Sequence, residues 1–426
     1  MTPIVEHPLR YSLANELHAR PFPALNAPGR AAYLALKPAD RAAARDRNAD
    51  RDHLIALLDR FGASHPQPGA THYSGRIGRN FLKWESHTEF VTYTIYGEGA
   101  AERPFDAATF GLFPEDWLAN APGTRITSAL IRIDRQDDDT QIIKNVGDWF
   151  VSESLAISRV LENELVVAGD FRIDEGGHMR FAIFARENTG AHRIGRVLQR
   201  LCEIETYKAM SMLGLARVRE MSPHLGDLDR RLADLVESMQ DDATKPAETL
   251  HELLGVSAEL ETLSARSSFR LSATGAYEAI VNQRIEILRE ERFLGRQTFA
   301  EFMMRRFDPA MRTVKSSEKR IQTLTARAVR ASELLRTRVD VERSAENKAL
   351  LESMNHRADL QLRLQQTVEG LSVVAISYYA LNLLVYLLSP VSKGLGLDKG
   401  VLAAGLTLPV ILAVWFMVRQ IRNKFH

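Results

Sequence analysis

The stretch that decides the architecture of this chain is "GLSVVAISYYALNLLVYLL", residues Gly370–Leu388, together with "VLAAGLTLPVILAVWFMV", residues Val401–Val418. Neither block contains a charged residue. The hydrocarbon core of a bilayer requires about 20 residues of α-helix, so each block is long enough to span it. The two blocks predict a transmembrane hairpin. The alternative is a hairpin buried in the core of a soluble protein.

Charges at the two ends of this hairpin predict its orientation. The tail 419–426 carries Arg419, Arg422 and Lys424, whereas the loop 389–400 carries two lysines offset by one aspartate. Because basic residues favour the cytoplasmic side, we expect a cytoplasmic C-terminus, and two spans then place the N-terminus in the cytoplasm too. The N-terminal residues also lack a signal-peptide pattern. We therefore expect a multi-pass protein of the inner (cytoplasmic) membrane, in contact with membrane lipid.

The segment 310–369, which leads into the first span, is predicted to be one long stalk helix. It contains no glycine and no proline. Apolar or small residues recur at three- and four-residue steps, first at Ile321, Leu324, Ala328, Ala331, Leu335 and Val339, and later at Leu350, Met354, Leu364, Val368 and Leu371. Such a stripe must be buried, either on partner helices from 227–300 or on copies of itself in a coiled coil. A homo-oligomer is therefore expected.

The residues before the stalk divide into a helical region, 191–309, and an α+β cytoplasmic domain, 1–190, with a mainly antiparallel sheet. Period-two patterns predict strands at Trp84–Gly97 and Thr124–Asp134 and a hairpin at Glu164–Arg186. Helices are predicted at Arg51–Phe61, Pro114–Asn120, Asp148–Glu164, His192–Arg219, 227–240, 246–264 and Arg270–Arg306. We expect a domain boundary near Met221–Asp227 and a helix restart at Pro309.

Composition and motifs exclude several functions. Lys+Arg 55 against Asp+Glu 54 gives no basic field of the kind that nucleic-acid binding requires. The one cysteine, Cys202, excludes an intramolecular disulfide and is expected to be a buried thiol. The chain has no P-loop, no G-x-S-x-G and no C-x-x-C. We therefore predict no catalytic residue and no firm cofactor.

Polar residues on the first span and its approach are the first candidate site. Tyr378, Asn382 and Tyr386 are spaced four residues apart and share one helix face, and Thr367 extends it. Polar groups at membrane depth usually face protein or water. They are therefore pore-lining candidates, or they form interhelical hydrogen bonds that hold an anchor together.

Two clusters in the N-terminal domain are further candidates. Glu85, His87 and Glu89 alternate along a predicted strand, which would place them on one face as ligands of a divalent cation. The cluster "NELHARPFPAL" near the N-terminus contains Glu16, His18 and Arg20. It is either a docking clasp, with leucines inward and Glu16 paired to Arg20, or part of a cytoplasmic pocket against the first cluster.

Three segments carry a resemblance: "HPLRYSLANELHARPFP" (His7–Pro23), "KWESHTEFVTY" (Lys83–Tyr93) and the first span. They resemble a bacterial family of uncharacterised, membrane-anchored proteins over nearly the whole chain. The layout is also similar to that of CorA-type magnesium channels, which implies a pentamer whose first span lines a pore. Those channels carry Gly-Met-Asn at the outer end of the first span, where this chain has "YLLSPVSKG", Tyr386–Gly394.

These observations predict an oligomeric inner-membrane protein of CorA-like architecture that passes cations. The alternative is a membrane-anchored scaffold or sensor whose cytoplasmic domain binds a protein partner or a small ligand. A tethered enzyme that uses Glu85, His87 and Glu89 is a third hypothesis, which no strong motif supports.

Overall fold

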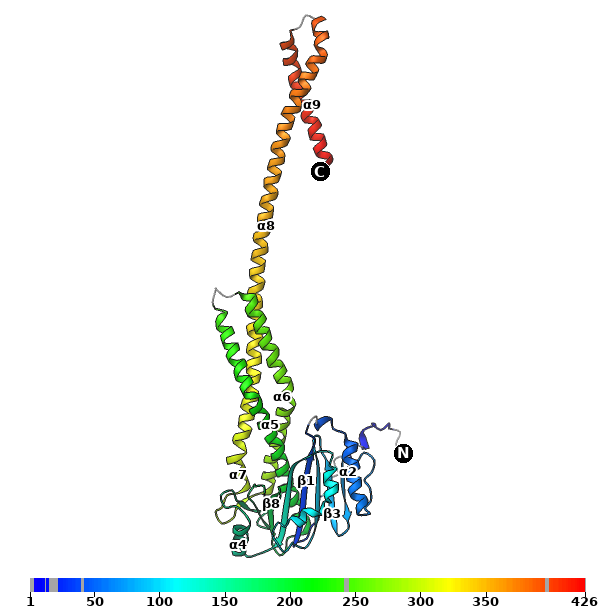
Figure 1. Ribbon diagram of the computed structural model, residues 1–426, viewed down its shortest axis with the longest axis vertical. Coiled ribbons are helices and arrows are strands. Elements are labelled where there is room, and N and C mark those ends of the chain that lie inside the picture. Colours follow the sequence, from blue (N-terminus) through cyan, green and yellow to red (C-terminus); the bar gives the residue numbers. More distant parts are fainter. Residues whose placement is uncertain are drawn as a thin grey trace. The chain divides into compact units, whose positions relative to one another are not determined.

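The computed structural model describes residues 4–11, 13, 14, 22–39, 42–240, 245–394 and 398–425 (Figure 1). The chain divides into two compact units, one of Met1–Asp241 with His251–Ala331 and one of Asp242–Leu250 with Ser332–His426. The first unit contains an α+β domain and long helices. The second unit contains the apolar C-terminal helices.

The described strands of the first unit form a 9-stranded sheet in the order β2-β3-β4-β1-β5-β8-β7-β6-β9. The strands are β1 (Gly29–Lys37), β2 (His72–Ile77), β3 (Asn80–Ser86), β4 (Val91–Glu98), β5 (Thr124–Arg135), β6 (Ala156–Val160), β7 (Leu165–Gly169), β8 (Met179–Ala185) and β9 (Glu291–Arg292). The predicted α+β class is confirmed, but the sheet is mixed. β5 and β8 pair in parallel, with Ile131 opposite Phe181, whereas the other neighbours pair antiparallel.

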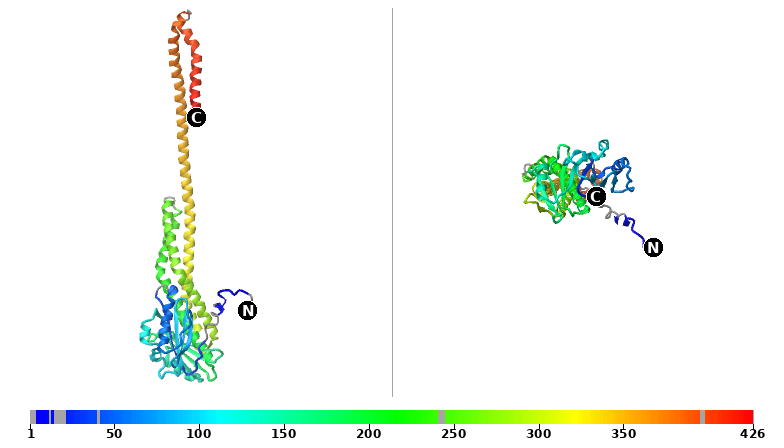
Figure 2. Two further views of the ribbon diagram at one scale, coloured as in Figure 1. Left: turned by 90° about the vertical axis from the view of Figure 1, so that its right-hand side faces the viewer. Right: turned by 90° about the horizontal axis from the view of Figure 1, so that it is seen from below.

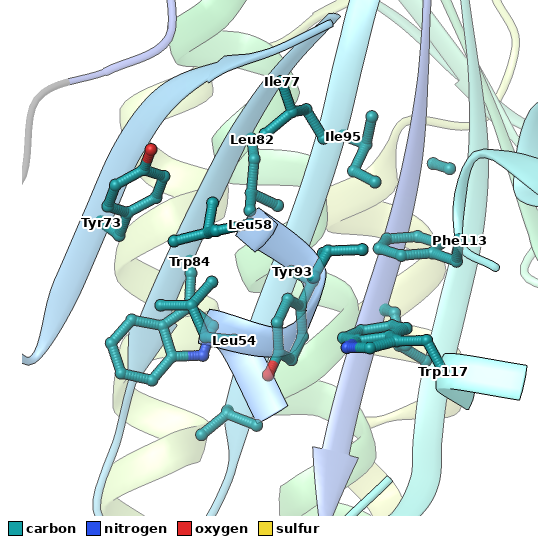
Figure 3. Packing of buried hydrophobic residues seen from close by; sticks show 14 of the residues in the cluster. Leu54, Leu58, Tyr73, Ile77, Leu82, Trp84, Tyr93, Ile95, Phe113 and Trp117 are labelled. Carbon is teal, nitrogen blue, oxygen red and sulfur yellow. The ribbon is translucent and has the colours of Figure 1, made fainter. Parts of the chain in front are cut away.

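One face of the sheet, here called the front face, is covered by short helices. They are α2 (Arg47–Arg60), α3 (Glu115–Ala119) and α4 (Asp139–Trp149), with 3-10 turns at η1 (Ala42–Ala44) and η2 (Ala107–Leu112). Leu54 and Leu58 of α2 pack with Trp84, Tyr93 and other strand side chains in one buried cluster, shown in Figure 3. A second cluster joins α4 to β6, β7 and β8. These clusters stabilise the packing of the front helices on the sheet, because burial of apolar area is the dominant favourable term in folding.

The opposite, back face carries the first of three long helices. They are α5 (Ala191–Ser238), α6 (Pro246–Leu288) and α8 (Asp308–Gly394), with the short α7 (Phe299–Arg306) before α8. Within the first unit α5 pairs with α6 through Arg231 and Glu259 at 3.1 Å, and α8 pairs with α5 through Arg320 and Asp229 at 2.6 Å. Ile321, Leu324, Ala328 and Ala331 of α8 are buried. The first part of the predicted stripe is thus covered, as a long amphipathic helix requires.

Several predicted element boundaries are wrong. The helix predicted at Asp148–Glu164 is instead the end of α4 followed by β6, because Asp138 caps α4 earlier and "AISRV" favours a strand. α5 continues through Pro223, so no boundary lies at Met221–Asp227, and residues 227–238 are its end. A proline in a helix costs about 3 kcal/mol, which the buried Leu225, Leu228 and Leu232 offset.

The helix predicted at Arg270–Arg306 is broken. α6 starts at Pro246 and ends at Leu288, and β9 and a turn precede α7. Arg289, Leu294 and Gly295 have positive φ angles there, which an α-helix does not allow. The predicted start of a new helix at "FDPAM" is confirmed: α7 ends at Arg306 and α8 begins at Asp308.

The second unit contains α8 from Ser332 onward and α9 (Lys399–Phe425). α8 passes through Gly370 without a break, so the stalk helix and the first apolar block are one helix. Figure 1 and the left view of Figure 2 show α9 running back beside the end of α8. Ser377 on α8 and Val410 and Val414 on α9 are buried there.

Candidate functional site

The segment that contains Glu85, His87 and Glu89 is a hairpin and not one strand. β3 ends at Ser86 and β4 begins at Val91, and the turn between them is closed by a hydrogen bond from His87 N to Phe90 O at 2.9 Å. Glu85 lies on β3 and pairs in register with Thr92, whereas the other two residues lie in the turn. The expectation that all three share one strand face is therefore wrong. The alternating pattern of "WESHTEF" also fits a strand end and a turn.

An arginine from before α2 fastens this turn. Arg45 is almost fully buried, and its guanidinium donates to His87 O at 2.5 Å, Phe90 O at 3.2 Å and Asp50 Oδ2 at 2.7 Å. It also donates to Ser86 Oγ at 3.0 Å. Hydrogen bonds from a charged donor to carbonyl groups are strong, so Arg45 fastens the turn to the segment before α2.

The third turn residue fastens the domain to α6. Glu89 is 0% exposed. Its carboxylate accepts a hydrogen bond from the Tyr277 hydroxyl at 2.8 Å and forms an ion pair with Arg270. Burial and the hydrogen bond to Glu89 raise the pKa of Tyr277, so its hydroxyl stays protonated and donates. Glu89 is therefore a structural carboxylate that links the hairpin turn to a long helix within the first unit.

A small polar cavity lies between the back face of the sheet and α5. Its lining includes Tyr33, Lys83, Glu85, His87, Thr92 and Thr94 from the sheet side, and Gln199, Cys202, Glu203, Thr206 and Tyr207 from α5. Lys83 Nζ donates to Gln199 Oε1 at 2.6 Å and lies 3.3 Å from Glu85 Oε2. The cavity measures about 20 Å³, which is room for about one water molecule. It is too small for an organic substrate in this conformation.

These contacts bear on the metal-site hypothesis. The carboxylate of Glu85 pairs with the Lys83 ammonium, and that of Glu89 pairs with the Arg270 guanidinium. These positively charged side chains would compete with a metal ion for the two carboxylates. Within the described part of the chain, no three His, Cys, Asp or Glu side chains gather closely enough to hold a metal ion. The three candidate ligands therefore do not form a site together.

Cys202 is buried on the inner side of α5, as expected from the sequence. Burial raises the pKa of its thiol, and nearby Glu203 acts in the same direction. A thiol in such surroundings is inert, because the thiolate is the reactive form.

The N-terminal candidates Glu16, His18 and Arg20 lie outside the described residues. The docking clasp is contradicted in its described part, because Leu9 and Leu13 are 53% and 62% exposed. Pro23 does line the polar cavity beside Glu85 and His87, and Leu25 N donates to Ala191 O at 3.2 Å. The chain directly after the cluster is thus held against the start of α5.

The two apolar helices of the second unit are long and apolar enough to cross a membrane. Only 6% and 11% of their apolar windows are buried, whereas a core helix of a soluble protein is mostly buried. Thr367, Tyr378, Asn382 and Tyr386 all lie on α8. Tyr378 and Tyr386 are exposed, and Thr367 Oγ1 donates to Arg363 O at 2.8 Å. Asn382 is half-buried.

Arg45, Lys83, Arg270 and Tyr277 are polar residues that the sequence pattern did not single out. Each is an ordinary residue in its own segment, and its role depends on a partner from a distant element. Arginine and lysine are mostly solvent-exposed, and the tyrosine lies on a long helix with no partner nearby in sequence, so no local signal marks these four.

Together these features define a class of chain in which a mixed α+β domain and long helices precede two candidate membrane-spanning helices. The chain belongs to the family described as protein of unknown function (DUF3422), whose family model matches residues 5–425. This confirms the predicted membership of an uncharacterised family. No curated protein and no solved structure matches the chain.

Proposed function

We propose that this protein is a homo-oligomeric membrane protein of CorA-like architecture whose first spans surround a path for cations. The order of the elements along the chain supports this proposal. An α+β domain is followed by a helix that runs unbroken into the first apolar block, then by a short connection and a second apolar helix. In this proposal both termini lie on the cytoplasmic side, the predicted loop 389–400 lies outside, and lipid covers the remaining helix surface.

The observation that carries this proposal is an uncovered stripe on α8. Leu350, Met354, Leu364, Val368 and Leu371 are between 57% and 73% exposed. They follow three- and four-residue steps, and the same steps continue to Tyr378 and Asn382 in the apolar block, although Arg357 and Gln361 occupy two positions of the repeat. Copies inserted in one membrane have parallel helices, so a second copy presents the same stripe in register.

The mass of the full-length protein in mild detergent, measured by native mass spectrometry, tests the proposal. We expect a closed ring of roughly four or more subunits, because a pore of two-span subunits needs several copies around an axis. A monomer or a dimer leaves no room for a pore and contradicts the proposal.

Asn382→Leu tests the cation path itself. The substitution removes the amide from the polar face, so we expect cation flux into liposomes to be lost while the native mass is unchanged. Leu383→Ala, one residue away and outside that face, is the matched control and should retain flux. Unchanged flux in Asn382→Leu would remove Asn382 from the path.

The second candidate function is a membrane-anchored sensor or scaffold. The polar cavity behind the sheet favours it, because Lys83 and Glu85 are charged groups buried inside the α+β domain and the half-buried Glu203 also lines the cavity. A ligand of the domain that leaves flux unaffected would support this alternative.

A further inference from the structure

Five arginines gather where the start of α5 runs past the end of α6. Arg193, Arg196 and Arg200 lie on α5, Arg284 lies on α6 and Arg289 directly follows it. Arg200 Nη1 lies 3.4 Å from Ile287 O, which brings the two helix ends together. Arg196, Arg284 and Arg289 all act electrostatically on Arg200. The cluster lies entirely within the first unit.

Carboxylates balance only part of this positive charge. Glu164 pairs with Arg193, Glu203 with Arg284, and Glu162 with Arg289 at 2.9 Å. Among the described residues, no carboxylate lies within ion-pair distance of Arg196 or Arg200. The Nε atom of Arg196 is buried and has no hydrogen-bond partner among the residues that the structure describes.

The surroundings of the Arg200 guanidinium disfavour its positive charge. Burial, followed by the nearby Arg196, lowers the pKa of Arg200, and Glu203 opposes this shift only in part. Arg196 and Arg200 are four residues apart on α5, so they lie on the same side of the helix. One anion placed there can accept hydrogen bonds from both guanidiniums.

We propose that Arg196 and Arg200 of α5 bind a phosphate-type oxyanion beside the end of α6. Guanidinium forks match the oxygens of phosphate and donate two hydrogen bonds at once, which makes arginine a preferred phosphate ligand. Arg284 and Arg289 add positive charge but remain paired to Glu203 and Glu162. This site is independent of the proposed cation path, because it uses no residue of the apolar helices.

Isothermal titration calorimetry tests the proposal. Inorganic pyrophosphate is titrated into the full-length protein in mild detergent. Wild type is expected to bind saturably. Arg200→Gln and Arg196→Gln should each weaken binding by about tenfold or more, because each removes charged hydrogen bonds. Arg200→Lys keeps the charge without the fork and should give an intermediate loss. Arg330→Gln, an exposed arginine on α8, is the matched control and should bind as wild type does.

A second arm separates the two sources of this chemistry. The same variants are titrated with phosphatidic acid in the detergent micelles. An Arg200-dependent response to pyrophosphate assigns the site to a soluble phosphate compound, and one confined to phosphatidic acid assigns it to a lipid headgroup. No saturable binding of either probe by wild type, or equal binding by Arg200→Gln and by the Arg330→Gln control, would overturn the proposal.

Discussion

Glu89→Ala is expected to lower the free energy of unfolding of the full-length protein by about 3–5 kcal/mol, the usual cost of removing one partner of a buried ion pair. Glu89 is fully buried, and Arg270 and Tyr277 of α6 both donate to it. The alanine variant leaves the Arg270 guanidinium without its carboxylate and the Tyr277 hydroxyl without its acceptor. Each unsatisfied buried group costs about 1–3 kcal/mol, and a charged one costs more.

Urea denaturation in mild detergent measures this effect through tryptophan fluorescence, because Trp84 and Trp117 lie in the core of the same domain. Glu89→Gln retains an acceptor for Tyr277 and should lose less. Glu220→Ala is the control, because Glu220 pairs with Arg217 on the surface and such pairs contribute about 0–1 kcal/mol. Equal midpoints for Glu89→Ala and Glu220→Ala would show that the turn does not depend on this link.

The helical parts of the fold follow from the sequence because their signals are local. The absence of glycine and proline over 310–369 and the three- and four-residue steps lead directly to α8, and the charge-free blocks lead to the two apolar helices. Pro223 is the instructive failure. A proline is a strong local signal for a boundary, but the buried leucines after it hold α5 together.

The sheet is harder to predict because its central strands carry little alternation. β1, "GRAAYLALK", lies between β4 and β5 and is buried on both faces, so its pattern of small and apolar residues indicates no exposed side. The parallel pairing of β5 with β8 depends on the crossover through α4, β6 and β7. No single segment contains that information.

The candidate sites show the same limit at the level of side chains. Glu85, His87 and Glu89 alternate within five residues of sequence, and this alternation predicts a shared face. The partners that decide their roles are distant: Arg270 is 181 residues from Glu89, and Gln199 is 116 residues from Lys83 beside Glu85. Only the fold brings these residues together. Glu85 and Glu89, which resemble metal ligands in the sequence, form internal ion pairs in the structure.

Leu364→Glu is expected to dissociate the proposed oligomer into smaller species, with monomer as the end point, in native mass spectra of the full-length protein. Leu364 lies in the middle of the uncovered stripe of α8 and is 66% exposed in the single chain. In a parallel assembly every copy would place its glutamate at the same level of the seam. Removing a charge from water without a partner costs several kcal/mol per ion, and like charges add repulsion. A cost of about 3 kcal/mol per subunit weakens association more than about a hundredfold.

The matched control for this prediction is two residues away. Leu362 is the same residue type on the same helix and is also exposed, at 51%, but it lies on the opposite side from the stripe. Leu362→Glu adds an identical charge and removes identical apolar surface, so it should leave the native mass unchanged. If both variants keep the wild-type mass, the stripe does not hold copies together. If both dissociate, the contact is not confined to the stripe, and the path around Tyr378 and Asn382 loses the geometry on which it depends.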